Sequence, residues 1–385
     1  MYSKLRYCGI ILSQNHMNIS PFRALHANIG MINSCDTFFE NVKDEFLAFQ
    51  KSGFYDKLNL DAYYILQIKT QYGTHTGLLC GVDIKEYLEG NILIHENTLS
   101  SKEQKMVHLF LKRKAFIKPV LLTYPTNNTL QQKLSFWTES HKPLVRALFE
   151  KSKEIHDIFA INDPELIREI TDFFKENVPQ TYIADGHHRC STAAYLYNQY
   201  QERGLPPPTD KIFSALFAMD QLTILDYNRM VDCLHLVSPA RLLAALSRLC
   251  YIDIEDTPKK PTCKHEWTLF IGRECFRLRW KKDVLNQYKD QVVRLDATIL
   301  DEQVFQNILG IKDVKTDQKI EYIEGAKGLN VILEKVLKKE TSIGICLYPV
   351  DIQEVVTIAD HHQIMPPKST WFEPRIKNGL LVFEF

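Results

Sequence analysis

The sequence predicts an α+β (mixed α/β) fold arranged as two lobes. Strand-like apolar runs dominate residues 19–125, a strong helix-start signal stands at Asp163, and strand and helix patterns alternate from residue 206 onward. The chain has 385 residues, which is too long for one compact core in most architectures. Two domains are therefore expected.

The N-terminal part is predicted to consist mostly of strands. Residues 62–69 and 76–83 are apolar runs on either side of Tyr72-Gly73-Thr74, a combination typical of a β-hairpin. Residues 115–124 form a further buried strand in this prediction. A charged stretch at residues 101–111 is expected to be a helix.

Helices alternate with strands after Asp163. Asp163-Pro164-Glu165 combines an N-cap residue, a first-turn proline and an early acid, which together indicate a helix start. Val178-Pro179 ends this helix and leads into a short strand around Tyr182. The remaining predictions are strands at 211–219, 222–225, 267–271, 275–280, 319–324, 342–348 and 380–385, and helices that start at Ser238-Pro239, at an N-cap Asp296 and at Ala326.

These patterns divide the chain into three parts. Residues 1–18 are expected to be an unstructured extension, with Met17 as an alternative start. Residues 19–205 form an N-terminal α+β domain. Residues 206–385 form a C-terminal α+β domain, whose last strand is expected to pack back on the first domain. The proline-rich loop of residues 204–208 marks the boundary.

Composition narrows the class of protein. Lys plus Arg and Asp plus Glu are 47 each, so the formal net charge is zero, which argues against broad binding to nucleic acid or to a membrane. No apolar run approaches the roughly 18 residues that a membrane span requires. Nine cysteines without a CxxC pair favour a reduced, cytoplasmic protein over a disulfide scaffold.

Residues 182–189 are the most informative segment. They are typical of a short strand, a turn at Asp185-Gly186 and a helix that opens with His187-His188 and Arg189. Backbone N–H groups at a helix N-terminus stabilise a bound anion, and the Arg189 guanidinium suits phosphate oxygens. A carboxylate such as Asp185 among phosphates is usually a metal ligand or a general base. The alternative is a helix cap with solvated histidines.

His95-Glu96-Asn97-Thr98 is a second candidate. The segment lies between a predicted strand and the charged helix, so it is expected on a loop. Glu96 is a candidate general base, and His95 is a candidate phosphate or metal partner. The alternative is a segment that caps the following helix.

A third candidate is the proline-bounded segment of residues 365–375. Lys368 supplies a positive charge, and the hydroxyls of Ser369-Thr370 can bind phosphate or metal. The alternative is a rigid turn before the last strand. Asn228-Arg229, after a predicted strand, is a smaller signal of the same kind.

Familiar nucleotide-binding signatures are missing. The chain has no GxxxxGK[ST] loop and no GxGxxG after a strand, and glycine is only 15 of 385 residues. A phosphate site must therefore use a helix N-terminus and basic side chains, as at Gly186. His187-His188 and His361-His362 lack the spacing of a zinc site. Mg²⁺ held by Asp185 and phosphate oxygens is expected instead.

Several segments, taken in order, resemble one family. They are Pro21-Phe22-Arg23-Ala24-Leu25, His95-Glu96-Asn97-Thr98 with Lys102-Glu103, Ile183-Ala184-Asp185-Gly186-His187-His188-Arg189, Asn228-Arg229, Leu309-Gly310-Ile311 with Lys315-Thr316-Asp317, and Met365-Pro366-Pro367-Lys368-Ser369-Thr370 with Gly379-Leu380. On these segments the chain is identified as a member of the bacterial family called domain of unknown function 1015, over about residues 19 to 385. The family's typical Pro-Pro-Tyr-Asp-Val segment is absent, and residues 32–36 stand in its place.

The segment from Asp185 to Arg189 is also similar to the phosphate-binding box of the ParB/sulfiredoxin superfamily, which includes free-serine kinases. The resemblance implies a ParB/sulfiredoxin-like strand–turn–helix phosphate site, with ATP or ADP and Mg²⁺ as cofactors. Carried over by position, Asp185 is the acid–base group or Mg²⁺ ligand. The residues expected to bind the nucleotide are Gly186, His187, His188, Arg189, Thr192, Asn228, Arg229, Lys368, Ser369 and Thr370.

The expected function is a nucleotide-dependent phosphotransferase that acts on a small hydroxyl substrate, with free serine as one candidate. Phosphoryl transfer needs positioning and charge neutralisation more than covalent chemistry. Glu96 is the expected base if a metal occupies Asp185. The alternative is a nucleotide-binding regulatory module without transfer chemistry. A nuclease would need a basic surface for DNA, and the balanced charge of this chain does not indicate one. Sulfiredoxin chemistry would need a cysteine where His187-His188 stand. The expected partner is a small molecule, with no membrane and no nucleic acid.

Overall fold

The computed structural model describes residues 16–97 and 100–385. Most of the predicted N-terminal extension and Thr98 of the His95–Thr98 motif lie outside the described residues. Met17 is buried, and the backbone N–H of Asn18 donates to Glu86 at 3.2 Å. The structure is a mixed α/β fold, as predicted.

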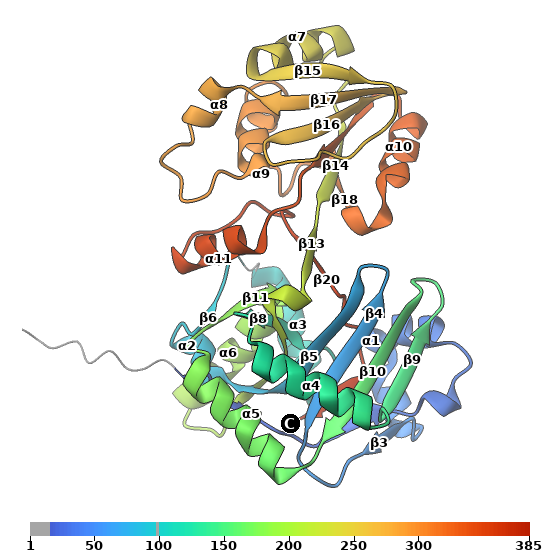
Figure 1. Ribbon diagram of the computed structural model, residues 1–385, viewed down its shortest axis with the longest axis vertical. Helices are drawn as coiled ribbons and strands as arrows, with labels where there is room; N and C mark the ends of the chain where they lie inside the picture. The colour runs from blue at the N-terminus through green and yellow to red at the C-terminus, as the bar shows by residue number, and fades with distance from the viewer. Residues whose placement is uncertain (1–15, 98–99) are drawn as a thin grey trace, which may run out of the picture.

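A nine-stranded sheet forms the larger part of the molecule (Figure 1). Eight strands lie in the order β6 (Ile92–Leu93), β11 (Thr181–Asp185), β8 (Val120–Tyr124), β12 (Lys211–Ala218), β5 (Gly73–Asp83), β4 (Tyr63–Thr70), β10 (Glu154–Ile161) and β9 (Val145–Phe149), and β1 (Ile19–Ser20) pairs with β5. Only the pairs β11–β6 and β12–β8 are parallel. Burial on both sides explains why β8, β12 and much of β5 are continuous apolar runs.

Helices cover both faces of this sheet. They are α1 (Cys35–Lys51), α2 (Ile84–Leu88), α3 (Ser100–Arg113), α4 (Asn128–Ser140), α5 (Pro164–Asn177) and α6 (His187–Glu202). In the view of Figure 1, α4 and α5 cover the near face of the sheet. On the far side, α6 packs against α2 and α3. Both α3 and α6 border a cavity of about 380 Å³.

A six-stranded antiparallel sheet lies at the other end of the long axis (Figure 1). Its order is β15 (Cys250–Glu255), β17 (Glu274–Trp280), β16 (Glu266–Ile271), β19 (Ser342–Leu347), β14 (Tyr227–Asp232) and β18 (Ile320–Glu324). The accompanying helices are α7 (Pro239–Leu249), α8 (Lys282–Asn286), α9 (Asp296–Ile299), a π-helix (Leu300–Gln306) and α10 (Leu329–Lys338). This sheet has its own apolar cores, separate from the core of the larger sheet.

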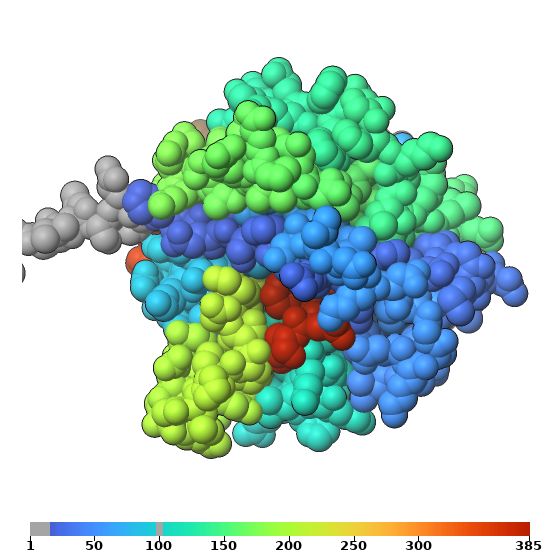
Figure 2. All heavy atoms as spheres, turned by 90° about the horizontal axis from the view of Figure 1, so that it is seen from below, coloured from blue at the N-terminus to red at the C-terminus, as the bar shows by residue number. Residues whose placement is uncertain are grey.

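Two smaller sheets pair strands that are far apart in the sequence. In one, β13 (Thr223–Leu225) pairs with β20 (Trp371–Glu373), so the chain leaves and re-enters the larger part side by side (Figure 1). The other has the order β3 (Tyr55–Lys57), β2 (Ala24–Ala27), β21 (Leu381–Glu384) and β7 (Ala115–Phe116). Figure 2 shows the C-terminal residues in red, with N-terminal residues in blue above them and to their right. The remaining elements are α11 (Ile352–Asp360) and short 3₁₀ helices at Ile29–Met31, Met219–Gln221 and Gly325–Lys327.

Several predicted elements are confirmed. The hairpin of residues 62–83 is β4 and β5. The Asp163 side chain caps α5 by accepting from the Leu166 N–H at 2.8 Å. The strand, turn and helix predicted around Gly186 are β11 and α6.

Other predictions are wrong in detail. Residues 19–125 are not mostly strands, because α1 buries Cys35, Phe39, Val42 and Phe46 at helical spacing. The strand predicted at 115–124 is two strands, interrupted at residues 117–119. Asp296 is not an N-cap: its carboxylate accepts from the His265 N–H at 2.9 Å and from Trp280 Nε1 at 3.1 Å. The helices α4 and α11 were not predicted.

The domain boundary at residues 205/206 remains a prediction. β12, which follows that boundary, is a strand of the nine-stranded sheet. A division along the sheets therefore falls after β12. No helix among the described residues is long and apolar enough to cross a membrane.

Candidate functional site

A cavity of about 380 Å³ lies beside the start of α6. Its walls come from the segment after β6, from α3, from the β11–α6 turn and from residues 365–378. The predicted site residues that line it are His95, Glu96, Asp185, Gly186, His187, His188, Arg189, Lys368, Ser369 and Thr370. Segments more than 250 residues apart in the sequence thus meet in one concave site.

The turn before α6 requires glycine. Gly186 has a φ of 110°, in the left-handed region that other residues rarely adopt. A Cβ at this position would lie 2.5 Å from Nη2 of Arg189. The turn therefore brings the Arg189 guanidinium back over the backbone and toward Asp185.

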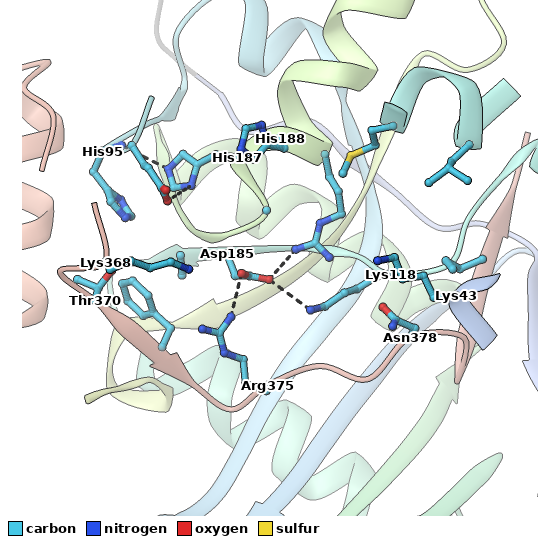
Figure 3. Close-up of a pocket in the computed structure, with 18 of the residues that line it drawn as sticks. Lys43, His95, Lys118, Asp185, His187, His188, Lys368, Thr370, Arg375 and Asn378 are labelled. Carbon is cyan, nitrogen blue, oxygen red and sulfur yellow. Dashed lines mark hydrogen bonds and ion pairs between the residues drawn. The ribbon is translucent and has the colours of Figure 1, made fainter. Parts of the chain in front are cut away.

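Asp185 is surrounded by three cations (Figure 3). Its Oδ2 accepts from Arg189 Nη2 at 2.6 Å and lies 3.4 Å from Lys118 Nζ. Its Oδ1 accepts from Arg375 Nη1 at 2.9 Å. We call these four residues the cationic cluster. Three positive charges against one negative charge leave two positive charges uncompensated in the cavity wall.

The cationic cluster fixes the protonation of Asp185. Burial raises the pKa of this carboxyl group, but Arg189, Lys118 and Arg375 together lower it well below its usual range. An ionised carboxylate that is held by two guanidinium groups is a weak base. It also does not fit the predicted role of a Mg²⁺ ligand, because a divalent cation would have to displace those groups. No cluster of three or more candidate metal ligands occurs among the described residues.

Lys118 is the least tightly held member of the cluster. Burial lowers its pKa to about 8, and Arg189 and Arg375 contribute to this shift. Its Nζ makes the longest of the three contacts with Asp185. An anion that enters the cavity would therefore find Lys118 available as a partner.

Arg375 is held by an aromatic ring. Its guanidinium carbon lies 3.7 Å from the ring centroid of Trp371, and the indole N–H of Trp371 donates to Glu373 Oε1 at 2.6 Å. The second oxygen of Glu373 accepts from the Arg375 backbone N–H at 3.0 Å. Stacking and hydrogen bonds together fix the direction in which Arg375 points.

The other side of the cavity carries two neutral imidazoles, His95 and His187, which we call the histidine pair. Their ring centroids are 4.6 Å apart at 84°. Burial lowers the pKa of His95 to about 4. Burial and the neighbouring His95 lower the pKa of His187 well below its ordinary value. Both rings are therefore uncharged at neutral pH.

The hydrogen bonds assign the tautomer of His187. The backbone N–H of His95 donates to His187 Nε2 at 3.4 Å, so Nε2 is the unprotonated nitrogen. The proton is then on Nδ1, which faces Glu96 Oε2 at 3.8 Å. The half-exposed carboxylate of Glu96 thus lies beside this N–H, beyond hydrogen-bond distance. His95 Nδ1 is buried and has no hydrogen-bond partner among residues 16–97 and 100–385.

Three predicted nucleotide-binding residues do not line this cavity. Thr192 is fully buried in α6. Asn228 is fully buried in β14, without a partner for its amide. Arg229 donates to the Tyr227 carbonyl at 2.7 Å and borders a separate cavity of about 20 Å³. Of this part of β14, Tyr227 is the residue that reaches the large cavity.

The sequence interpretation missed important wall residues. Lys118 lies between two short apolar strands. The sequence signal that could have identified it as a site residue is a single lysine before a proline inside an apolar stretch. Arg375 follows a proline at the end of the third candidate segment. Met106, Leu109, Phe110 and Ile117 form an apolar wall, and their helical or strand spacing alone indicates only core packing.

The fold and the site define a mixed α/β protein with a cation-rich cavity at a helix N-terminus. The model of the family described as "Protein of unknown function (DUF1015)" matches residues 20–298. The chain therefore belongs to this family. Lys368 and Arg375 lie beyond the matched range. No curated protein matches the sequence significantly.

Solved structures show similarity at low sequence identity. SbnI with C-terminal truncation from Staphylococcus aureus is 12% identical, with a TM-score of 0.41, and the match covers 78% of this chain and 85% of that one. A free serine kinase in complex with AMP is 13% identical, with a TM-score of 0.36 and coverage of 78% and 92%. A conserved hypothetical protein from Pyrococcus furiosus is 14% identical, with a TM-score of 0.35 and coverage of 78% and 93%. At these TM-scores the function has to be argued from the site itself.

Proposed function

We propose that this protein is a nucleotide-dependent phosphotransferase that acts on a small hydroxyl substrate. The donor is ATP or ADP, and free serine is one candidate acceptor. The observation that carries the proposal is the cationic cluster at the start of α6, inside a cavity of about 380 Å³. The predicted cytoplasmic location and the small-molecule partner belong to the same proposal.

The cationic cluster suits phosphate groups. Its two uncompensated positive charges and the backbone N–H groups of α6 favour an anion. Guanidinium groups such as Arg189 and Arg375 can each give two hydrogen bonds to a phosphoryl group. Asp185 then acts as a positioning residue: it holds the cations in place and leaves their outer N–H groups for the ligand. This role replaces the predicted role of general base.

The apolar wall suits a nucleobase. Met106, Leu109, Phe110 and Ile117 line the cavity together with the cationic cluster. Cavities of roughly 300–1,000 Å³ with apolar walls and a few directed polar groups are typical of small-ligand sites. A nucleotide with its base on this wall and its phosphates at Lys118 and Arg189 fills the site in a single orientation.

Glu96 is the proposed general base. Its carboxylate is half-exposed, lines the cavity and lies 3.8 Å from the protonated Nδ1 of His187. A substrate hydroxyl on this side can transfer its proton to Glu96 as it attacks the terminal phosphorus. Arg189 and Arg375 stabilise the charge that develops on the transferring phosphoryl group. No step assigned here requires a metal ligand from the chain.

The test is a direct assay of phosphoryl transfer. Purified protein is incubated with ATP or ADP, MgCl₂ and a panel of small hydroxyl compounds that includes free serine, and products are followed by ³¹P NMR. The expected result is one phosphorylated acceptor in the panel and loss of one phosphate from the nucleotide. Nucleotide binding without any product would instead favour the alternative, a regulatory module. Absence of nucleotide binding would contradict both functions.

A further inference from the structure

We infer that the acceptor carries an anionic group next to its hydroxyl, and that Lys368 binds this group. The inference rests on the proposed phosphotransferase function and narrows its substrate class. It reassigns Lys368 from the nucleotide to the acceptor. Neutral polyols and sugars are then poor substrates, and hydroxy acids or phosphorylated alcohols are good ones.

Lys368 is a cation of the cavity wall that lies outside the cationic cluster. It forms no ion pair with any described carboxylate, and its Nζ lies 3.4 Å from the phenol oxygen of Tyr227. The Lys368 backbone has a φ of 56°, a left-handed conformation that costs a residue with a side chain about 1 kcal/mol or more. Such conformations gather at functional sites, where the fold holds a side chain in a required direction.

Two aromatic rings connect Lys368 to the cationic cluster. Lys368 Nζ lies 5.2 Å from the ring centroid of Tyr227. The Tyr227 ring meets the Trp371 ring edge-on, with centroids 5.7 Å apart at 71°. Trp371 in turn carries Arg375 at 3.7 Å. These contacts hold Lys368 and Arg375 against adjoining rings, so the cavity wall offers an anion a cation outside the cationic cluster.

The acceptor hydroxyl fits between Lys368 and the cationic cluster. In the view of Figure 3, His95 and Lys368 lie on one side of Asp185, while Lys118 and Lys43 lie on the other. The buried Nδ1 of His95 has no hydrogen-bond partner among the described residues, and the Glu96 carboxylate lies 3.8 Å from His187 Nδ1. A buried ring nitrogen without a partner is a polar group that a ligand can satisfy. The histidine pair and Lys368 therefore surround the acceptor, and the cationic cluster holds the donor.

The transfer step balances with these assignments. The acceptor oxygen bonds to the terminal phosphorus of the nucleotide, and the bond from that phosphorus to its bridging oxygen breaks. The bridging oxygen keeps the electron pair, so the nucleotide leaves with one phosphate fewer. The hydroxyl proton passes to Glu96. Lys368 takes no part in bond making and serves as a specificity-determining residue.

Matched acceptors test the inference. Glycerate and serine carry a carboxylate, and glycerol 3-phosphate carries a phosphate. Glycerol and serinol are their counterparts without an anionic group; they are called the neutral acceptors, although serinol keeps the ammonium group that serine also carries. With MgATP we expect kcat/KM for at least one anionic acceptor to exceed that of its neutral counterpart at least tenfold. Lys368→Met should raise KM for that acceptor about tenfold. It should leave the Kd for ADP and the KM for neutral acceptors within about twofold, and Lys282→Met controls for loss of a surface lysine.

A binding arm separates failure of this inference from failure of the proposed function. Binding of the same five compounds to the ADP-loaded protein is measured by calorimetry. Binding of an anionic acceptor that Lys368→Met weakens, without any transfer, would refute the kinase activity and support the anion site. Equal binding and turnover of neutral and anionic compounds would overturn the inference. Weakened ADP binding in Lys368→Met would also overturn it, because Lys368 would then serve the nucleotide.

Discussion

The two sides of the cavity hold their charges in opposite ways. In the cationic cluster, burial is outweighed by opposite charge, so Asp185 stays ionised and three cations surround it. In the histidine pair, burial outweighs the nearby carboxylates and keeps both imidazoles neutral. One side can therefore bind an anion strongly, while the other side holds uncharged imidazoles beside the carboxylate of Glu96, the proposed proton acceptor. The following predictions test this division, from the largest expected effect to the smallest.

The largest effect is expected from Asp185→Ala. Without the carboxylate, Arg189, Arg375 and Lys118 repel one another and lose their positions. We expect ADP affinity and phosphoryl transfer to fall at least a hundredfold, about 3 kcal/mol, while the far-UV circular dichroism stays that of a folded protein. Calorimetry with ADP measures the loss. Asp61→Ala, which removes an exposed ion pair with Arg23, is the matched control, and full activity in Asp185→Ala would reject the assignment.

Glu96→Gln should affect chemistry and spare nucleotide binding. Loss of a general base commonly lowers kcat by about a hundredfold or more. Because Glu96 faces His187 and not the cationic cluster, the Kd for ADP should stay within about twofold. Steady-state kinetics and calorimetry on the same preparation separate the two quantities. An equal loss of ADP binding and turnover would show that nucleotide binding and proton transfer are not assigned to separate sides of the cavity.

The pH dependence of nucleotide binding should report Lys118. Its pKa is lowered to about 8, and only the protonated amine pairs with a phosphate. Affinity should therefore be highest below pH 8 and fall about tenfold between pH 7 and pH 9. Titration of ADP binding at several pH values checks this. In Lys118→Arg the slope over this range should disappear, because a guanidinium group stays protonated.

The smallest effect is expected from Thr192→Val. Thr192 is fully buried, and its hydroxyl has no partner in the structure. Replacement of the hydroxyl by a methyl group should leave ADP affinity within about twofold and stability within about 1 kcal/mol. Thermal unfolding with and without ADP measures both. A loss of ADP-induced stabilisation would return Thr192 to the nucleotide site, where the sequence first placed it.

Local signals in the sequence predicted local structure well. The cap at Asp163 and the turn at Gly186 have a physical cause within a few residues, so both were predicted correctly. The polar side chains around Gly186 could also be recognised as a site, because four of them in five positions do not suit a core. By contrast, α1 was missed because its aromatic and β-branched residues are also common in strands.

Long-range contacts could not be predicted in the same way. Lys118 and Arg375 both contact the carboxylate of Asp185. Nothing near Lys118 in the sequence indicates this, since 257 positions separate the two cations. Asn228 and Arg229 belong to a motif, but both lie in β14 between β18 and β19, and both side chains are buried away from the cavity of about 380 Å³. The preceding residue, Tyr227, was not predicted as a site residue, but its side chain lines the cavity.

The route of the C-terminal segment has a consequence for biosynthesis. Residues 365–378 complete the cavity with Lys368 and Arg375, and β21 then joins β2 and β7. A ribosome makes these residues after every other part of the cavity wall. A nascent chain that has already folded its larger sheet therefore still lacks Lys368 and Arg375, and any translation product that stops short of residue 365 has an incomplete cavity wall.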